Sequence, residues 1–192
     1  RFHAPAPCVE ATHAPSAQGR GAGTKRRSRR SASHGHKPDL GAHAGGFTDC
    51  LLRAGAAKVY AVERGYGVLN FRLRQNPRVI VMERTDALHL TLPEPMDLIT
   101  IDVGWTRQAL ILPVARALLS AEGQIVSLIK PHYEANPSDL AAGLLPDNLT
   151  DNVLAPIRAQ LPTLRLQLIA ETESPLRGHG GNREFLWHLK PM

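Results

Sequence analysis

The sequence predicts an α/β domain in which helices cover both faces of a mostly parallel sheet. From residue 39 to the end of the chain, short apolar segments of strand length alternate with segments of helical character. This alternation is typical of βαβ units, whose crossover helices pack on the two faces of a parallel sheet. A glycine-rich turn that begins after residue 39 supports the prediction, because it has the form of a turn between a strand and a helix.

Six segments have the composition of strands. Each is a short apolar run bounded by polar residues or turn formers. They span residues 58–63, 78–83, 97–103, 124–130, 164–170 and 184–189. The runs at 78–83 and 97–103 are expected to be buried strands, as in a sheet that is covered on both faces.

Helical segments lie between these strands. The first follows the glycine-rich turn and is expected to end at Gly55, a residue suited to the position after a helix. The other helices are expected over residues 68–74, 109–119 and 147–160. Pro113 falls in or near the first turns of its helix, whereas Pro156 should kink or break the last one. Residues 131–146 hold three prolines and are expected to form an irregular surface loop.

The first strand does not follow this pattern. A buried strand should precede Asp39, yet residues 34–38 are polar and end in Pro38, which cannot donate to a sheet ladder. We therefore expect the central strand to be short or missing. The sequence places the folded domain over residues 39–192, with a truncated first strand.

Residues 1–38 are expected to form a disordered basic tail. The whole chain of 192 residues has a net charge of +6, and residues 1–40 carry eight Lys or Arg against two acids. The remainder, residues 41–192, is therefore neutral. The tail lacks apolar periodicity, which is typical of disorder. Its basic cluster at residues 25–30 either binds RNA phosphates through counterion release or is a solvated charge run, and the composition leaves both open.

The sequence gives no sign of a membrane protein or a metalloprotein. It contains neither an apolar run long enough to span a bilayer nor the apolar core of a signal sequence. We expect a cytoplasmic protein with no membrane partner. We also expect no metal site, and we expect His43 in the glycine-rich turn to be exposed.

The glycine-rich turn has the spacing Asp-x-Gly-x-x-x-Gly. Glycines at these positions can adopt positive φ and leave the backbone open to a ligand. Backbone N–H groups of such a turn, at the start of a helix, suit a polar or partly anionic cofactor. The cofactor-binding residues expected here are Asp39, Gly41, Gly45, Gly46, Phe47 and Thr48.

A second acid, Glu63, closes the apolar run at 58–63. In doubly wound folds, an acid at the end of the second strand receives ribose hydroxyls. The spacing of the turn differs from the Gly-x-Gly-x-x-Gly pattern of dinucleotide sites. Together these features favour S-adenosylmethionine (SAM) over a nicotinamide dinucleotide, which stays the alternative. Asp86 is expected either to face the adenine end of the cofactor or only to close a turn.

From Asp39 onward, the sequence resembles the FtsJ/TlyA-type ribosomal RNA methyltransferases, with most similarity to the haemolysin-like TlyA branch. Several short motifs occur in the family's order and together extend over about residues 39–189. They lie at residues 39–41, 45–49, 59–67, 83–86, 97–103, 128–131 and 174–186. An ordered series of motifs is a far more specific signal than the glycine-rich turn alone.

The resemblance implies a Rossmann-like class I methyltransferase that transfers a methyl group from SAM to a ribose 2′-hydroxyl of ribosomal RNA, alone or in a ribosomal subunit. In this family a Lys-Asp-Lys-Glu set surrounds the reacting hydroxyl. By motif, the aspartate corresponds to Asp102, the second lysine to Lys130 and the glutamate to Glu184. The first lysine has no match, and the S4-like N-terminal RNA-binding domain of the TlyA branch is also missing from the sequence.

Each of these residues also has an ordinary structural interpretation. Lys130 could be a surface lysine with a buried stem, and Glu184 could be a solvated strand end. Asp102 ends a buried strand, where the ligand crevice of such folds opens. Trp105 and Tyr133 flank the candidate residues and could stack on an RNA base or pack in the core.

Three functions follow from these observations. The first is an active RNA 2′-O-methyltransferase, in which Lys130 would accept the hydroxyl proton and Asp102 would orient the Lys130 side chain. The second is a catalytically impaired homologue that binds RNA or SAM, since the first strand and the first lysine are incomplete. The third, an NAD-dependent oxidoreductase, is disfavoured because the dinucleotide fingerprint is lacking.

Overall fold

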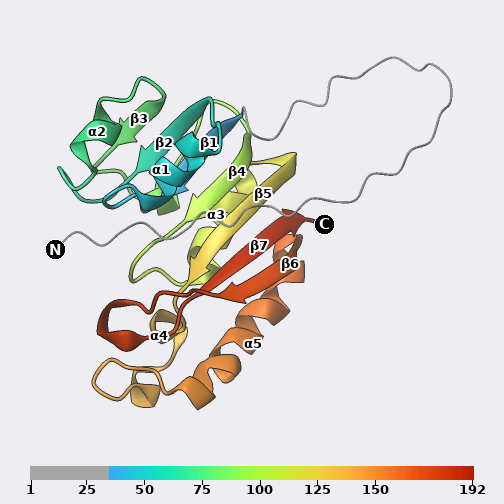
Figure 1. Cartoon of the computed structure of the whole chain (residues 1–192). Coiled ribbons are helices and arrows are strands. Elements are labelled where there is room, and N and C mark those ends of the chain that lie inside the picture. The colour runs from blue at the N-terminus through green and yellow to red at the C-terminus, as the bar shows by residue number, and fades with distance from the viewer. Residues whose placement is uncertain (1–34) are drawn as a thin grey trace, which may run out of the picture.

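The computed structural model describes residues 35–192, whose seven strands form one sheet (Figure 1). The strand order is β3-β2-β1-β4-β5-β7-β6. All neighbouring strands are parallel except for β7, which runs antiparallel to β5 and β6. The strands are β1 His36–Leu40, β2 Lys58–Val62, β3 Val79–Met82, β4 Met96–Ile101, β5 Leu119–Ile129, β6 Leu166–Glu173 and β7 Phe185–Pro191. The predicted α/β class with a mostly parallel sheet is confirmed.

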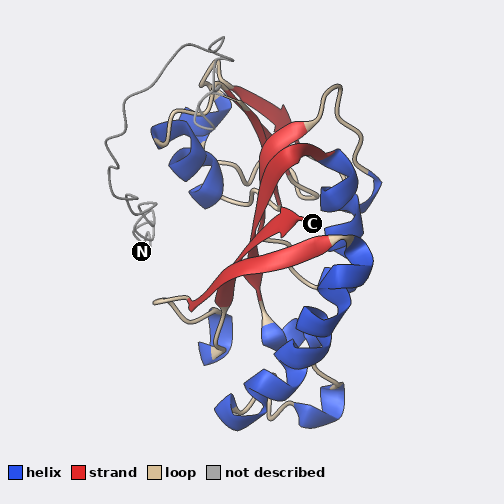
Figure 2. Cartoon of the chain, turned by 90° about the vertical axis from the view of Figure 1, so that its right-hand side faces the viewer, coloured by secondary structure: helices blue, strands red, loops and turns tan. Residues whose placement is uncertain are grey.

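Helices cover both faces of the sheet (Figure 2). They are α1 Gly46–Arg53, α2 Phe71–Arg74, α3 Gln108–Leu118, α4 Pro131–Glu134 and α5 Thr150–Gln160. The apolar residues of α1 pack with Val59 of β2 in one cluster, whereas those of α3 and α5 belong to a second, larger cluster. None of the helices in residues 35–192 has the length and apolar character needed to cross a bilayer.

The large cluster arises from the alternation of side chains along the strands. In β7, Phe185, Trp187 and Leu189 are buried, and the residues between them are half-buried. These side chains meet the apolar faces of α3 and α5, on which Ile111 and Leu154 are fully buried. Removal of this apolar area from water is the main source of the sheet's stability.

The first strand is short rather than missing. β1 pairs with β2 through all five residues but with β4 only through Asp39 and Leu40. Pro38, which has no N–H, therefore lies where the strand pairs with β2 alone. Residues 36–38, which the sequence analysis assigned to the tail, belong to β1 instead. The prediction of disorder otherwise concerns residues 1–34, which lie outside the described residues.

Two predicted elements differ from the structure near β3. Helix α2 begins only at Phe71, because Asn70 caps it by accepting a hydrogen bond from the N–H of Arg72 at 2.9 Å. Strand β3 was expected to be buried, but it is an edge strand whose residues are half-buried or exposed. The apolar composition of Val79–Met82 predicts a strand but does not indicate whether that strand lies at the centre or the edge of the sheet.

Prolines and the expected loop give further differences. Helix α5 continues through Pro156. Both Pro156 and Asn152, whose carbonyl loses its helical partner, are exposed, so water can satisfy that carbonyl. Residues 131–146 are irregular only in part, because α4 and a single-turn helix at Pro137–Asp139 lie within them.

The glycine-rich turn adopts the conformation that the sequence predicted. Gly41 and Gly45 have φ of 84° and 101°, and Gly55 ends α1 with φ of 85°. Glycine is favoured at position 45 because of how the turn packs against α2. A Cβ there would lie 2.1 Å from Cδ1 of Leu73, so any larger residue would displace this side chain of α2 as well as strain the left-handed backbone.

Gly45→Ala should therefore lower the free energy of unfolding by about 1–3 kcal/mol, through left-handed backbone strain and the clash with Leu73. Gly46→Ala is the matched control, because a Cβ at that neighbouring position would meet nothing within 4 Å. Denaturant unfolding of the two variants tests this. Equal stability of the two variants would contradict the packing role of Gly45.

Candidate active site

A cavity of about 530 Å³ opens at the carboxyl ends of the parallel strands. This volume is in the range of small-molecule sites. The residues that line it follow β1, β2, β3, β4 and β5, which is where ligands bind in open α/β sheets. Among the predicted site residues, the lining includes Gly41, Glu63, Asp86, Asp102 and Lys130.

Asp39 lies beneath the glycine-rich turn and does not line the cavity. Its carboxylate is fully buried and accepts hydrogen bonds from the hydroxyls of Thr48 at 2.6 Å and Thr100 at 3.0 Å. The three residues belong to β1, α1 and β4, so one carboxylate joins three elements. Burial raises the pKa of Asp39 to about 6, against the opposing effect of the two hydroxyl donors.

The other residues predicted in the turn shape the site from outside the cavity. Gly45, Gly46, Phe47 and Thr48 do not contribute to its lining. Gly41 does, and a Cβ there would lie 2.3 Å from the carbonyl oxygen of Asp102. The turn therefore packs directly against the end of β4.

Glu63 and Asp86 form one wall of the cavity. The Glu63 carboxylate accepts hydrogen bonds from the N–H groups of His43 at 2.9 Å and Gly65 at 2.7 Å, which joins the glycine-rich turn to the loop after β2. Asp86 caps a single-turn helix by accepting a bond from the N–H of Leu88 at 3.0 Å, and that bond lowers its pKa. Asp86 thus both closes a turn and faces the cavity.

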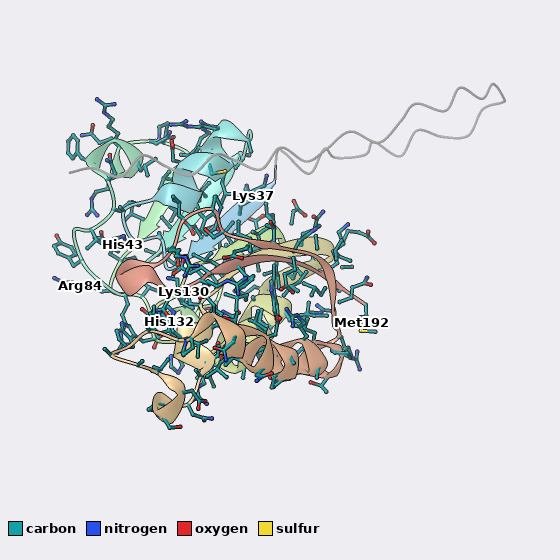
Figure 3. All side chains as sticks on the ribbon, turned by 60° about the horizontal axis from the view of Figure 1, so that its bottom comes forward. Lys37, His43, Arg84, Lys130, His132 and Met192 are labelled. Atoms are coloured by element: carbon teal, nitrogen blue, oxygen red, sulfur yellow. The ribbon has the colours of Figure 1, made fainter. Side chains whose placement is uncertain are left out.

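Asp102 and Lys130 meet at the opposite wall. Each directly follows a strand, β4 or β5, and Nζ of Lys130 lies 2.5 Å from Oδ1 of Asp102. Figure 3 shows Lys130 between His43 and His132 in the same part of the molecule. The structure therefore brings together two of the three residues predicted to be catalytic.

Glu184, the third, immediately precedes β7 and does not line the cavity. Burial raises the pKa of Glu184, Lys130 lowers it and Asp102 raises it, so both charges act on this carboxyl. The loop before it packs closely, since a Cβ at Gly178 would lie 2.3 Å from Oε1 of Glu184. Glu184 is thus held by its own loop at the edge of the ion pair.

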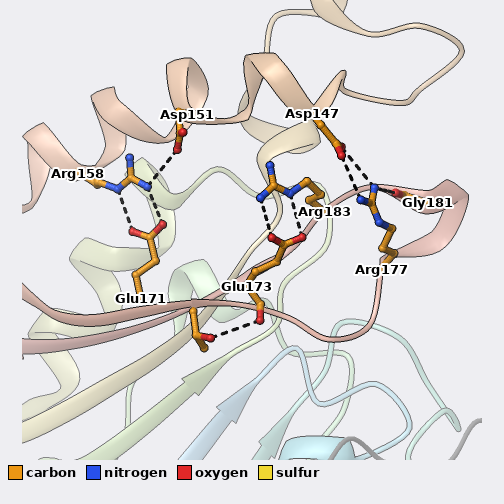
Figure 4. Close-up of polar contacts among 9 residues, drawn as sticks. Asp147, Asp151, Arg158, Glu171, Glu173, Arg177, Gly181 and Arg183 are labelled. Carbon is orange, nitrogen blue, oxygen red and sulfur yellow. Dashed lines mark hydrogen bonds and ion pairs between the residues drawn. The ribbon is translucent and has the colours of Figure 1, made fainter.

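Ion pairs fix that loop and the elements around it (Figure 4). Arg183 binds Glu173 at 2.6 Å, and Arg177 binds Asp147 at 3.1 Å. The buried side chain of Asn182 accepts a bond from the N–H of Leu145 and donates one to the carbonyl of Gly143. The connection that carries Glu184 is therefore anchored to residues 143–147.

Trp105 lies at the rim of the cavity and is 86% exposed, so it is not part of the core. Its φ of 61° is uncommon for a bulky residue. Its ring lies 4.8 Å from that of Tyr133, which also lines the cavity. The alternative of core packing is wrong for Trp105.

The sequence analysis missed several lining residues and one partner of Asp39. The missed lining residues are Val62, Arg64, Thr85, Ala87, Leu88, Val103, Gly104, Thr106 and Ile111. All except Thr106 and Ile111 stand within two residues of a predicted acid, so their position at strand ends was a usable signal. Thr100 lies inside β4, and nothing in the sequence connects it to Asp39. Residues 35–192 contain no cluster of side chains that could hold a metal ion.

The raised pKa of Asp39 predicts a dependence of stability on pH. Between pH 4 and pH 6 the unfolded chain releases this proton but the folded chain retains it, so stability falls as pH rises and is constant above the folded pKa. The unfolding free energy of the wild type minus that of Asp39→Asn should decrease by up to about 3 kcal/mol from pH 4 to pH 7. Denaturant unfolding of both proteins at a series of pH values measures this difference. A difference that stays constant with pH would refute the raised pKa of Asp39.

Comparisons with known proteins agree with this geometry. The FtsJ-like methyltransferase family model matches residues 30–190. The chain is 40% identical over 157 residues to the 16S/23S rRNA (cytidine-2′-O)-methyltransferase TlyA of Mycobacterium tuberculosis, a match that covers 78% of this chain and 58% of that protein. The chain thus spans less than two thirds of the length of this curated relative.

Solved structures extend the comparison to the fold. A candidate hemolysin from Streptococcus thermophilus superposes with a TM-score of 0.80 at 33% identity, over 84% of this chain and 61% of that chain. The tRNA methyltransferase TrmK of Bacillus subtilis, at 18% identity and a TM-score of 0.56 over 84% of this chain and 62% of that chain, shares the fold alone. The predicted resemblance and the Rossmann-like class I methyltransferase fold are confirmed, and the chain belongs to the FtsJ-like methyltransferase family.

Proposed function

We propose that this protein transfers a methyl group from SAM to a ribose 2′-hydroxyl of ribosomal RNA. The observation that carries the proposal is the ion pair of Lys130 and Asp102 in the wall of the cavity, with Glu184 beside it. The relative from Mycobacterium tuberculosis that bears the name of this activity supports it. Ribosomal RNA, alone or within a ribosomal subunit, is the proposed partner, and such a substrate places the protein in the cytoplasm.

The cavity suits SAM. Each oxygen of Glu63 already accepts one backbone N–H and keeps a lone pair for a ribose hydroxyl. Beyond it, Ala87, Leu88 and Ile111 give the lining an apolar part that fits an adenine ring. The charged amino acid end would lie toward Gly41, where the turn meets β4. When bound, the cofactor supplies an electrophilic methyl group on a sulfonium.

Positioning of the ribose oxygen is the main task of the protein. The reaction forms an O–C bond as the S–C bond breaks, and the hydroxyl proton must leave. Correct orientation supplies about 7–11 kcal/mol of the barrier reduction, and a general base about 10²–10⁴-fold in rate. Nζ of Lys130 and Oδ1 of Asp102, 2.5 Å apart, form a rigid pair that can hold the hydroxyl in line.

The route of the proton differs from the one that the sequence suggested. Lys130 is paired with the carboxylate of Asp102. To accept the hydroxyl proton, its Nζ must first pass a proton on. Glu184 is the acceptor that the site offers, because burial raises the pKa of its carboxyl. Trp105 is placed to stack on the base of the target nucleotide.

A catalytically impaired homologue is the second candidate, and one observation favours it. Among residues 35–192, no lysine other than Lys130 lines the cavity. Lys37 is buried in β1, where burial lowers its pKa, and it lies outside the cavity lining. The two candidates differ in turnover, whereas either could bind SAM.

Lys130→Ala should reduce methyl transfer to ribosomal RNA by at least about 10²-fold, because the hydroxyl loses both its positioning partner and its base. Incorporation of labelled methyl groups measures this, with SAM affinity determined in parallel. Lys190→Ala in β7 is the matched control and should keep full activity. Wild-type SAM binding without any methyl transfer would instead establish the impaired homologue.

The raised pKa of Glu184 predicts an acid limb in the rate profile. As pH falls through that pKa, the carboxyl becomes protonated and can no longer accept a proton, so kcat/KM should decrease at a higher pH than an ordinary glutamate would cause. Glu184→Gln should be slower and should lack this limb. An unchanged acid limb in the variant would exclude Glu184 from the proton route.

A further inference from the structure

An exposed aromatic surface lies outside the candidate active site. Tyr66, in the loop after β2, and Phe71, the first residue of α2, are each 68% exposed, and Val68 between them is 41% exposed. Single exposed apolar side chains are ordinary, but several large ones from one short segment indicate an interaction surface.

The same segment concentrates positive charge. Residues 64–84 contain five arginines and one acid, Glu83, whereas residues 41–192 as a whole are neutral. Two of these arginines have structural roles. Arg74 binds Glu83 with Nη2 to Oε2 at 3.1 Å, and Arg78 donates to carbonyls at the end of α1. The other three arginines, Arg64, Arg72 and Arg84, are exposed.

The surface is joined to the cavity wall. The guanidinium of Arg84 lies 4.4 Å from the centre of the Tyr66 ring, and the N–H of Arg84 donates to the carbonyl of Gly65 at 3.2 Å. Arg64 itself lines the cavity. Figure 3 shows Arg84 at the periphery of the molecule, beyond His43 and Lys130. Tyr66 is therefore held on the outer side of the same wall that carries Glu63.

We propose that the surface formed by Arg64, Tyr66, Phe71, Arg72 and Arg84 binds a single-stranded stretch of the RNA substrate next to the target nucleotide. This inference rests on the proposed function. Exposed aromatic rings stack on bases of any sequence, and arginines pair with the intervening phosphates. The exposed Trp105 occupies another part of the cavity rim, so the strand would cross the mouth of the cavity between two aromatic platforms.

The positive charge of this surface favours RNA over two other possible occupants, the basic tail of this chain and a second copy of it. The basic cluster at residues 25–30 carries the same sign as this surface, so the tail of this chain would be repelled. A second copy of the chain would bring the same arginines into contact with each other in a two-fold interface. An anionic polymer with flat, stackable groups matches both the charge and the aromatic rings.

Binding of a labelled single-stranded oligouridine to the 192-residue chain tests the proposal. The double variant Tyr66→Ala, Phe71→Ala should weaken the affinity by about tenfold or more, because each base that stacks contributes severalfold or more. Arg72→Gln should reduce the dependence of log K on log salt by about 0.7, as expected for one lost phosphate contact on a single strand. The affinity for S-adenosylhomocysteine, measured by calorimetry, should not change in either variant.

Arg165→Gln, Ile169→Ala is the matched control, because Arg165 just before β6 and Ile169 within β6 are both exposed at the opposite edge of the sheet. It should bind oligouridine as the wild type does. Equal affinities of the double variant and the wild type, or no RNA binding by the wild type, would overturn the proposal. So would a change from dimer to monomer in the double variant, which would assign the surface to self-association. If the wild-type chain binds oligouridine but transfers no methyl group, and the variants lose RNA binding, the proposed function is refuted. The assignment of the RNA-binding surface would still hold.

Discussion

The buried carboxylate of Asp39 is the interaction on which the site depends. Strand β1 has only five residues and pairs with β4 through two of them, so the sheet ladder alone ties β1 weakly to β4. Hydrogen bonds from Thr48 and Thr100 add a direct connection between β1, α1 and β4. A buried charge is costly unless it is hydrogen-bonded, and the two hydroxyl donors offset part of that cost while joining three elements.

The position of β1 determines the geometry of the cavity. The turn after β1 can rest on the end of β4 only because Gly41 has no Cβ, and the same contact fixes the backbone of Asp102. Asp102 then holds Lys130 at the end of the neighbouring strand. Glu184 arrives from the far end of the chain, on a loop fixed by ion pairs and by the buried Asn182. The carboxyl ends of β4 and β5 and the start of the antiparallel β7 thus lie at one edge of the sheet.

Much of this could be predicted because it depends on local pattern. Apolar runs define strands, an acid after a strand faces the ligand crevice, and a glycine before a helix signals positive φ, as at Gly45. The remainder depends on contacts between distant segments. The polar sequence of β1 conceals a strand because its partners, not its composition, stabilise it. The role of Asp39 required knowledge of Thr100, and the exposure of Trp105 and Tyr66 could not be read from their hydrophobicity. Most strand segments were predictable, whereas the contacts of single side chains were not.

The central claim is that a five-residue β1, fixed by Asp39, is sufficient to form a cofactor site. A calorimetric titration of the 192-residue chain with S-adenosylhomocysteine tests it most directly, with Glu63→Ala and Lys190→Ala in parallel. We expect one site of about micromolar affinity that Glu63→Ala weakens by at least about tenfold, because a ribose loses a charged hydrogen-bond acceptor. Lys190→Ala should bind as the wild type does. Absence of binding by a folded wild-type chain would contradict the account.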